Sequence, residues 1–404
     1  MKSIKEIYKI GPGPSSSHTM GPRFAAREFL NRVPEDAASY NVTLYGSLAA
    51  TGKGHMTDAA IEEVFQDKGL EVQILWEPET FLPFHPNAMT FRAFDKEGKE
   101  QTHMTVYSVG GGAIKIEGDP DEKDLPDIYP LNNLEDIQEY CEKTGRCYWE
   151  YVEECEGPGI WDHLHEVWET MRHAVEHGLS MEGRLPGPLN LRRKAAQYQV
   201  KAEGYKDNLR SRGLTFAYAL AVSEENASGG TIVTAPTCGS SGVVPGVLYH
   251  LWKSRNIPEN RILRALATAG LIGNVVKQNA SISGAEVGCQ GEVGVACAMA
   301  AASACQLFGG SPAQIEYAAE MGLEHHLGMT CDPVCGLVQI PCIERNAYAA
   351  ARALDANIYA SFSDGGHRVS FDKLVTVMKE TGHDIPSLYK ETAEGGLAKS
   401  MADE

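Results

Sequence analysis

The first 120 residues alternate between short strand-like runs and helical runs. The pattern predicts helices over 24–33 and 57–68, and strands over 42–48, 71–76, 88–95, 103–109 and 113–117. A few strands with helices packed on one face form an α+β layer. We expect this α+β N-terminal domain to cover residues 1–150, with the acidic, proline-containing segment 118–133 leading out of it.

Beyond residue 155 the hydrophobic residues follow a helical period. A stripe of apolar side chains predicts an amphipathic helix that ends at Gly178, and its members are Ile160, Leu164, Val167, Met171 and Val175. From Thr215 onward the segments are rich in alanine, with helices expected over 262–276, 293–308 and 314–322. Because small side chains let helices approach closely, we predict a compact all-α C-terminal domain over 155–404 that holds a buried site.

Length and charge narrow the class of protein. A chain of 404 residues is long for a single core, which agrees with two domains. The formal net charge of −18 and the lack of a basic run argue against nucleic acid or an anionic membrane as a partner. Residues 1–10 are charged throughout, unlike a secretory signal, and the uncharged stretch 226–252 contains Pro236 and Pro245. We therefore expect a cytoplasmic protein.

Ten cysteines without a secretory signal do not indicate a disulfide framework. Cys289, Cys331 and Cys342 are separated by 41 and then 10 residues, and each lies in a predicted loop marked by glycine or proline. The paired knuckles typical of zinc sites are missing, whereas three thiolates from separate loops suit a [4Fe–4S] cluster with one iron left open. On spacing alone, unrelated core cysteines remain the simpler interpretation.

Two polar, glycine-rich runs stand out in the first domain. Residues 11–19 precede a predicted helix, where hydroxyl groups and free backbone N–H groups can hold a carboxylate or a phosphate. The alternative is a capped, flexible loop. Residues 47–58 resemble a phosphate-binding loop only superficially, because Lys53 is followed by Gly54 instead of Ser or Thr. Nucleotide binding is therefore not expected.

These runs, taken in order, resemble the iron–sulfur-dependent L-serine dehydratases across almost the whole chain. In the first domain the similar segments are residues 10–22, 44–55 and His85-Pro86-Asn87. In the second they are residues 224–227, 234–237, 284–294, 330–333 and 341–346, and the cysteine spacing matches the cluster triad of that family.

The resemblance implies an L-serine ammonia-lyase that forms pyruvate and ammonia, with a [4Fe–4S] cluster on Cys289, Cys331 and Cys342. A histidine near its reference pKa suits the base that removes the Cα proton. His55 is the first candidate because Gly52 and Gly54 would expose it in a loop, and His18 is the second. We expect the active site to lie between the domains and the enzyme to be a homodimer. The residues expected to bind the substrate are Ser15, Ser16, Ser17, Thr19, Lys53 and Asn87.

The chain also departs from the family pattern. Relatives often end in a cysteine that caps the fourth iron, whereas this sequence ends in Asp403-Glu404, so we expect water, hydroxide or a carboxylate oxygen at that position. Cys238 and Cys335 are not signature ligands, and a regulatory domain between the halves has little room. Threonine dehydration, cysteine desulfuration and a cluster-containing sensor without turnover remain alternatives.

Overall fold

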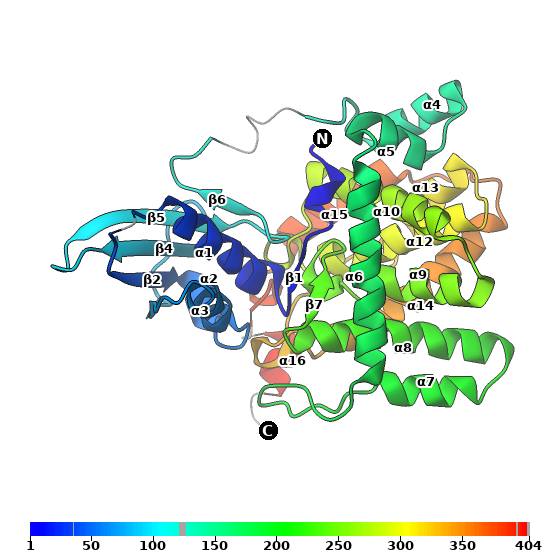
Figure 1. The fold of residues 1–404 in the computed structure, drawn as a ribbon. Helices are drawn as coiled ribbons and strands as arrows, with labels where there is room; N and C mark the ends of the chain where they lie inside the picture. The colour runs from blue at the N-terminus through cyan, green and yellow to red at the C-terminus, as the bar shows by residue number, and fades with distance from the viewer. Residues whose placement is uncertain (35, 121–126, 393–394, 402–404) are drawn as a thin grey trace. The chain divides into compact units, whose positions relative to one another are not determined.

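The computed structural model describes residues 1–34, 36–120, 127–392 and 395–401, so Asp403 and Glu404 lie outside the described residues. The chain divides into two units, which we call the sheet unit (residues 12–126) and the helical unit (residues 1–11 and 127–404) (Figure 1). The division between residues 126 and 127 lies within the acidic segment 118–133 and before the expected boundary at 150–155. That boundary stays a prediction about the functional domains.

A five-stranded sheet forms the centre of the sheet unit. Its strands lie in the order β3-β2-β4-β5-β6, and β2 pairs parallel with β3 while the other pairs are antiparallel. Val42 lies opposite Phe91, which in turn lies opposite Met104, so large apolar side chains share one face. The strands are β2 (Ser39–Tyr45), β3 (Gln73–Glu77), β4 (Asn87–Phe94), β5 (Glu100–Ser108) and β6 (Ile114–Ile116).

Two helices cover the apolar face of this sheet. α1 (Gly21–Arg32) contributes Phe29 and α3 (Thr57–Gln66) contributes Phe65 to the same buried core. The predicted strand over 42–48 is wrong in its last three residues. Gly46 has a φ of 48°, which ends the extended backbone and begins the short helix α2 (Gly46–Thr51).

The helical unit packs around alanine-rich α12, which contacts α9, α10, α13 and α14. A Cβ placed on Gly322 of α13 would lie 3.0 Å from the Cα of Ala298 in α12, so this contact requires a small residue. The longer helices are α4 (Leu134–Thr144), α5 (Tyr148–Glu156), α6 (Ile160–Ser180), α7 (Ala195–Glu203), α8 (Asp207–Ala227), α9 (Val243–Arg255), α10 (Glu259–Asn279), α12 (Val295–Leu307), α13 (Pro312–Glu324), α14 (Cys342–Ser361) and α15 (Phe371–Asp384).

Shorter elements complete both units. A two-stranded sheet joins β1 (Ile10–Pro12) to β7 (Thr231–Val233). The short helical segments are η1 (Ile4–Glu6), η2 (Ser16–Met20), η4 (Cys238–Ser240), α11 (Gly284–Val287), η5 (Gln290–Gly294), η6 (Val334–Gly336), η7 (Ser387–Tyr389) and α16 (Gly396–Ser400).

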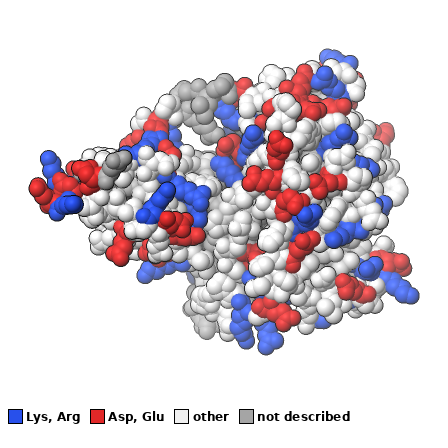
Figure 2. Space-filling view, viewed as in Figure 1, with Lys and Arg blue, Asp and Glu red and all other residues white. Residues whose placement is uncertain are grey.

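These elements confirm a mixed α/β N-terminal region followed by a helical C-terminal region. Among the described residues, no helix combines the length and the apolar character that a membrane span needs. Lys and Arg are interspersed with Asp and Glu over the described residues on the face seen in Figure 2.

Candidate functional site

Local backbone features place the three predicted cluster cysteines. Cys289 follows Gly288, whose φ of 75° ends α11, and it caps the π-helical turn η5. Cys331 is extended: its N–H donates to the Tyr389 carbonyl (2.8 Å), and its carbonyl accepts from the Glu391 N–H (2.7 Å). Cys342 is the first residue of α14, so its predicted loop position is wrong. The three side chains are buried, with residue exposures of 3%, 5% and 8%.

The thiols of Cys289 and Cys331 lie close to each other and to one carboxylate. The sulfurs of Cys289 and Cys331 and a carboxylate oxygen of Glu292 all lie within 4.8 Å of one another. Glu292 Oε2 is 3.8 Å from Cys289 Sγ and 3.9 Å from Cys331 Sγ. A hydrogen bond with Cys289, followed by burial, raises the pKa of Cys331 well above its ordinary value. Burial raises the pKa of Cys342, and nearby Cys289 raises it further.

This donor set fits an iron–sulfur cluster. Buried thiols this close together are costly to ionise unless a positive group compensates, and bound iron is such a group. Three thiolates leave one iron of a [4Fe–4S] cluster without a cysteine ligand. A Cβ at Gly284 would come within 2.6 Å of Glu292 Oε2 and 3.2 Å of Cys331 Sγ, so the wall of the site has no room for a side chain there.

Sequence reasoning missed two charged residues beside the thiols. Glu292 accepts a hydrogen bond from the Thr237 hydroxyl (2.7 Å), and its pKa is raised chiefly by burial. Arg345 donates to the Thr330 carbonyl (2.7 Å). Burial lowers the pKa of Arg345, but the neighbouring thiols outweigh that effect and raise it overall. Each residue follows a predicted ligand by three positions, a helical spacing that could have identified them.

The other cysteines have different environments. Cys335 is exposed in η6 with a φ of 56°, whereas Cys297 and Cys305 are buried on α12. Cys238 is buried, and its pKa is raised well above the ordinary value by burial first and by Glu292 second.

In the sheet unit the two polar runs come together at the predicted histidines. The rings of His18, on η2, and His55, between α2 and α3, lie 4.6 Å apart. The Thr19 hydroxyl donates to the His55 carbonyl (2.7 Å), and the Thr57 hydroxyl donates to the His18 carbonyl (2.5 Å). These two bonds tie the runs to each other within one buried group.

The two histidines differ in their hydrogen bonds. His18 Nδ1 is 2.9 Å from the Ser17 hydroxyl, and its Nε2 is 3.1 Å from the Ser47 hydroxyl. His55 Nδ1 is buried and has no hydrogen-bond partner among the described residues, and the same holds for Asn87 Oδ1. Buried polar atoms without a partner are rare and are expected where a ligand binds. His55 therefore has a ring nitrogen available to a substrate.

The predicted exposure and ordinary pKa of His55 are both wrong. The residue is 2% exposed because its turn packs against η2. Burial lowers its pKa to about 4. The pKa of His18 is lowered well below its usual range by burial first and by the nearby His55 second. Both rings are therefore neutral at physiological pH.

The predicted substrate-binding residues fall into two groups. Ser15, Ser16, Ser17, Thr19 and Asn87 are buried. Ser15 Oγ accepts from the His18 N–H (3.1 Å), so part of this hydroxyl set caps η2. Lys53 is exposed, and its ammonium lies 5.7 Å from the centre of the Trp76 ring. Its role in substrate binding stays a prediction.

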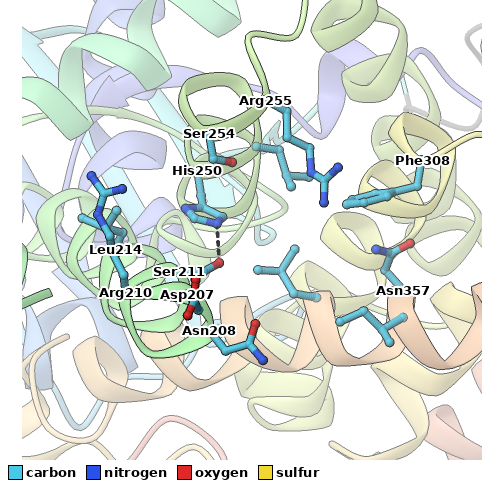
Figure 3. Close-up of a pocket in the computed structure, with 13 residues that line it drawn as sticks. Asp207, Asn208, Arg210, Ser211, Leu214, His250, Ser254, Arg255, Phe308 and Asn357 are labelled. Atoms are coloured by element: carbon cyan, nitrogen blue, oxygen red, sulfur yellow. Dashed lines mark hydrogen bonds between the residues drawn. The ribbon is translucent and has the colours of Figure 1, made fainter. Parts of the chain in front are cut away.

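A separate cavity of about 570 Å³ lies in the helical unit (Figure 3). Ser211 hydrogen-bonds His250 there (2.8 Å), and the Arg255 guanidinium lies 4.3 Å from the centre of the Phe308 ring. Asn357 also lines the cavity. It follows Cys342 by fifteen residues on the same helix, which places the two residues about 22 Å apart along the helix axis. None of the described residues lining it is a predicted site residue.

Comparison with known proteins covers both units. Residues 97–398 match the family model of the serine dehydratase alpha chain, and residues 3–67 and 62–119 match that of the serine dehydratase beta chain. The chain is 42% identical to an L-serine dehydratase of Streptomyces coelicolor, over 99% of both chains. It is also 42% identical to an L-serine dehydratase of Haemophilus influenzae, over 98% of this chain and 99% of the relative. With L-serine dehydratase 2 of Escherichia coli the identity is 40% over 99% of both.

Proposed function

Because this chain belongs to the iron–sulfur L-serine dehydratase family, with beta and alpha parts fused in one chain, we propose that it converts L-serine to pyruvate and ammonia. The observation that carries the proposal is the buried thiol group of Cys289, Cys331 and Cys342, which suits a metal cluster better than a packed core. Core cysteines need no carboxylate or guanidinium beside them, whereas Glu292 Oε2 lies 3.8 Å from Cys289 Sγ, and the thiols raise the pKa of Arg345.

The proposed cofactor is a [4Fe–4S] cluster held by these three cysteines of the helical unit. When bound, it supplies a Lewis acid for the serine hydroxyl, which is otherwise a poor leaving group. Gly284 keeps the wall of the site open, and Thr237 orients Glu292 at its edge.

His55 is the proposed general base. Its neutral ring can accept the Cα proton at Nδ1, the buried nitrogen without a partner among the described residues. Loss of that proton and of the β-hydroxyl removes one water and leaves aminoacrylate. Aminoacrylate then tautomerises to an imine, and addition of water releases pyruvate and ammonia. His18 holds the alternative role, but both of its ring nitrogens already have hydroxyl partners.

The remaining predicted residues would bind the amino acid itself. The hydroxyl groups of Ser15, Ser16 and Ser17 suit the substrate carboxylate, with Lys53 adding positive charge. Thr19 would join them by giving up the bond that its hydroxyl donates to the His55 carbonyl. Asn87 Oδ1 is a buried acceptor without a partner among the described residues, which suits the substrate ammonium. In this proposal the sheet unit (within the expected domain 1–150) binds serine, and the helical unit (within 155–404) carries the iron.

We also propose a cytoplasmic homodimer that acts without nucleic acid or membrane. Aromatic side chains on α14 and at its C-terminal cap are exposed: Tyr348 by 70% and Tyr359 by 57% on the helix, and Phe362 by 90% at the cap. Exposed apolar faces of this kind commonly pack against another protein surface, and a second copy provides one. Light scattering should give twice the chain mass, and Phe362→Glu should lower it. A monomeric wild-type protein would contradict the proposal.

The test of function uses protein purified without oxygen. Iron and sulfide should be present at about four each per chain, and L-serine should yield pyruvate and ammonia in equal amounts. L-Threonine and L-cysteine are assayed in parallel, since a larger kcat/KM with either would reassign the substrate. Iron-free protein that retains full activity would refute the proposed cofactor.

A further inference from the structure

Arg345 is a mostly buried cation in the first turn of α14. It follows Cys342 by three residues, and its side chain is only 19% exposed. Burying a guanidinium is costly unless its N–H groups find acceptors. The guanidinium of Arg345 therefore needs acceptors or negative charges close by.

The partners of Arg345 connect the three cysteine-bearing segments. Its Nη1 donates to the carbonyl of Thr330, the residue before Cys331 (2.7 Å). Its Nη2 lies 3.7 Å from Oδ1 of Asp332, the residue after Cys331. The charges of Cys289 and Cys342 raise the pKa of Arg345, and the backbone of Arg345 belongs to the helix that begins at Cys342. One side chain thus links segments far apart in the sequence.

Asp332 fixes the direction of the guanidinium. Its carboxylate accepts hydrogen bonds from the Thr330 hydroxyl (2.9 Å) and from the Leu397 N–H of α16 (2.8 Å), and the residue is 4% exposed. These two hydrogen bonds, one to each carboxylate oxygen, hold the Asp332 side chain in place beside its cation. The planar fork of arginine can meet this carboxylate and the Thr330 carbonyl together, which a lysine ammonium does less well.

The placement has an electrostatic consequence for a cluster on these cysteines. Hydrogen bonds to ligand sulfurs and nearby charge are among the features that set the reduction potential of iron–sulfur centres. A cation favours the more electron-rich state, because its attraction grows with the negative charge of the centre. Second-layer contacts of this kind also hold metal ligands in position.

We propose that Arg345 is a positioning residue for the cluster. It holds the Cys331 segment in ligand geometry through Thr330 and Asp332, and its charge raises the midpoint potential of the bound cluster. This inference rests on the proposed function, because it requires the cluster but not a particular substrate.

The experiment compares Arg345→Gln and Arg345→Lys with wild-type holoenzyme and with Arg368→Gln. Arg368 is an exposed arginine in the loop between α14 and α15, so its variant removes the same charge at an exposed position. Midpoint potentials come from anaerobic reductive titration followed by electron paramagnetic resonance. Cluster retention is measured from the rate at which iron is released to a chelator, with slower release meaning stronger retention.

Arg345→Gln should lower the midpoint potential and weaken iron retention by roughly 10–100-fold, the usual effect of losing a supporting contact. Arg345→Lys should keep a potential near wild type while releasing iron faster, because charge is retained but the fork is lost. Arg368→Gln should match wild type in both measurements. An unchanged potential and unchanged iron release in Arg345→Gln would overturn the proposal.

If the Arg345→Gln variant binds no cluster, its midpoint potential cannot be measured, and a second variant tests the electrostatic role. If Arg345→Gln retains no iron, Asp332→Asn removes the counter-charge and should raise the midpoint potential. A lowered or unchanged potential in that variant would refute the electrostatic role. Wild-type protein without a cluster would instead defeat the proposed function, so the two failures are distinguishable.

Discussion

Replacing His55 by alanine should remove most turnover while leaving the cluster in place. The residue lies in the sheet unit and is not a predicted iron ligand, so iron content should stay at the wild-type level. A general base typically contributes 10²–10⁴-fold to the rate, and kcat should fall by roughly that factor. His103→Ala is the matched control, because His103 is exposed on β5 and pairs with Glu100.

The pH dependence follows from the burial of His55. Burial lowers its pKa from 6.5 to about 4, a difference worth about 3 kcal/mol against protonation. The neutral ring is the form that accepts a proton, so the competent state persists below the usual histidine range and is lost only as the pH falls through about 4. An ordinary histidine would be mostly protonated at about pH 6.

The assay is kcat/KM for pyruvate formation, measured anaerobically between about pH 4.5 and 8.5 with residual iron checked at each pH. We expect no loss of activity with a midpoint near pH 6.5. Such a loss, with iron retained, would refute the assignment of a buried neutral base. A nearly normal His55→Ala enzyme together with an inactive His18→Ala enzyme would transfer the role to His18.

Three further predictions concern the cluster, the substrate and acid stability. Alanine at any one of Cys289, Cys331 and Cys342 should remove the brown colour, most iron and activity, whereas Cys297→Ala should keep all three; an active, iron-free Cys331→Ala protein would contradict this assignment. Asn87→Ala should raise KM for serine by roughly 10-fold or more with iron unchanged, as expected for a lost hydrogen bond to a charged group, and an unaltered KM would exclude that contact. Unfolding by denaturant should become easier as pH falls from about 6.5 towards 4, since burial lowers the pKa of His55 and of His250 to about 4 each while unfolded histidines gain protons near 6.5. A His250→Gln variant should show a shallower pH dependence, and an equal slope would argue against that residue.

Local patterns in the sequence determined the sheet strands and several of the long helices. The apolar stripe from Ile160 predicted α6, and alanine-rich runs predicted α10, α12 and α13. These predictions succeed because helical periodicity depends only on residues close together in the sequence. The five sheet strands were also predicted, although the first was extended past Gly46. The residues around Gly46 favour a strand, but the positive φ of Gly46 ends the strand there.

Resemblance to a family, rather than spacing, selected the three cysteines from ten. Spacing alone favoured unrelated core cysteines, since nothing local distinguishes a ligand thiol from a packed one. The close approach of Cys289 and Cys331 to Glu292 appears only when residues far apart in the chain are brought together.

Tertiary packing decided the chemistry of the individual groups. The sequence suggested an exposed His55 of ordinary pKa, whereas packing against η2 buries the ring and keeps it neutral. Arg345 and Asp332 were ordinary charged residues until folding paired them with each other beside the thiols. Segment type depends on neighbours in the chain, but burial, partners and pKa depend on neighbours in space, and only the folded structure supplies those.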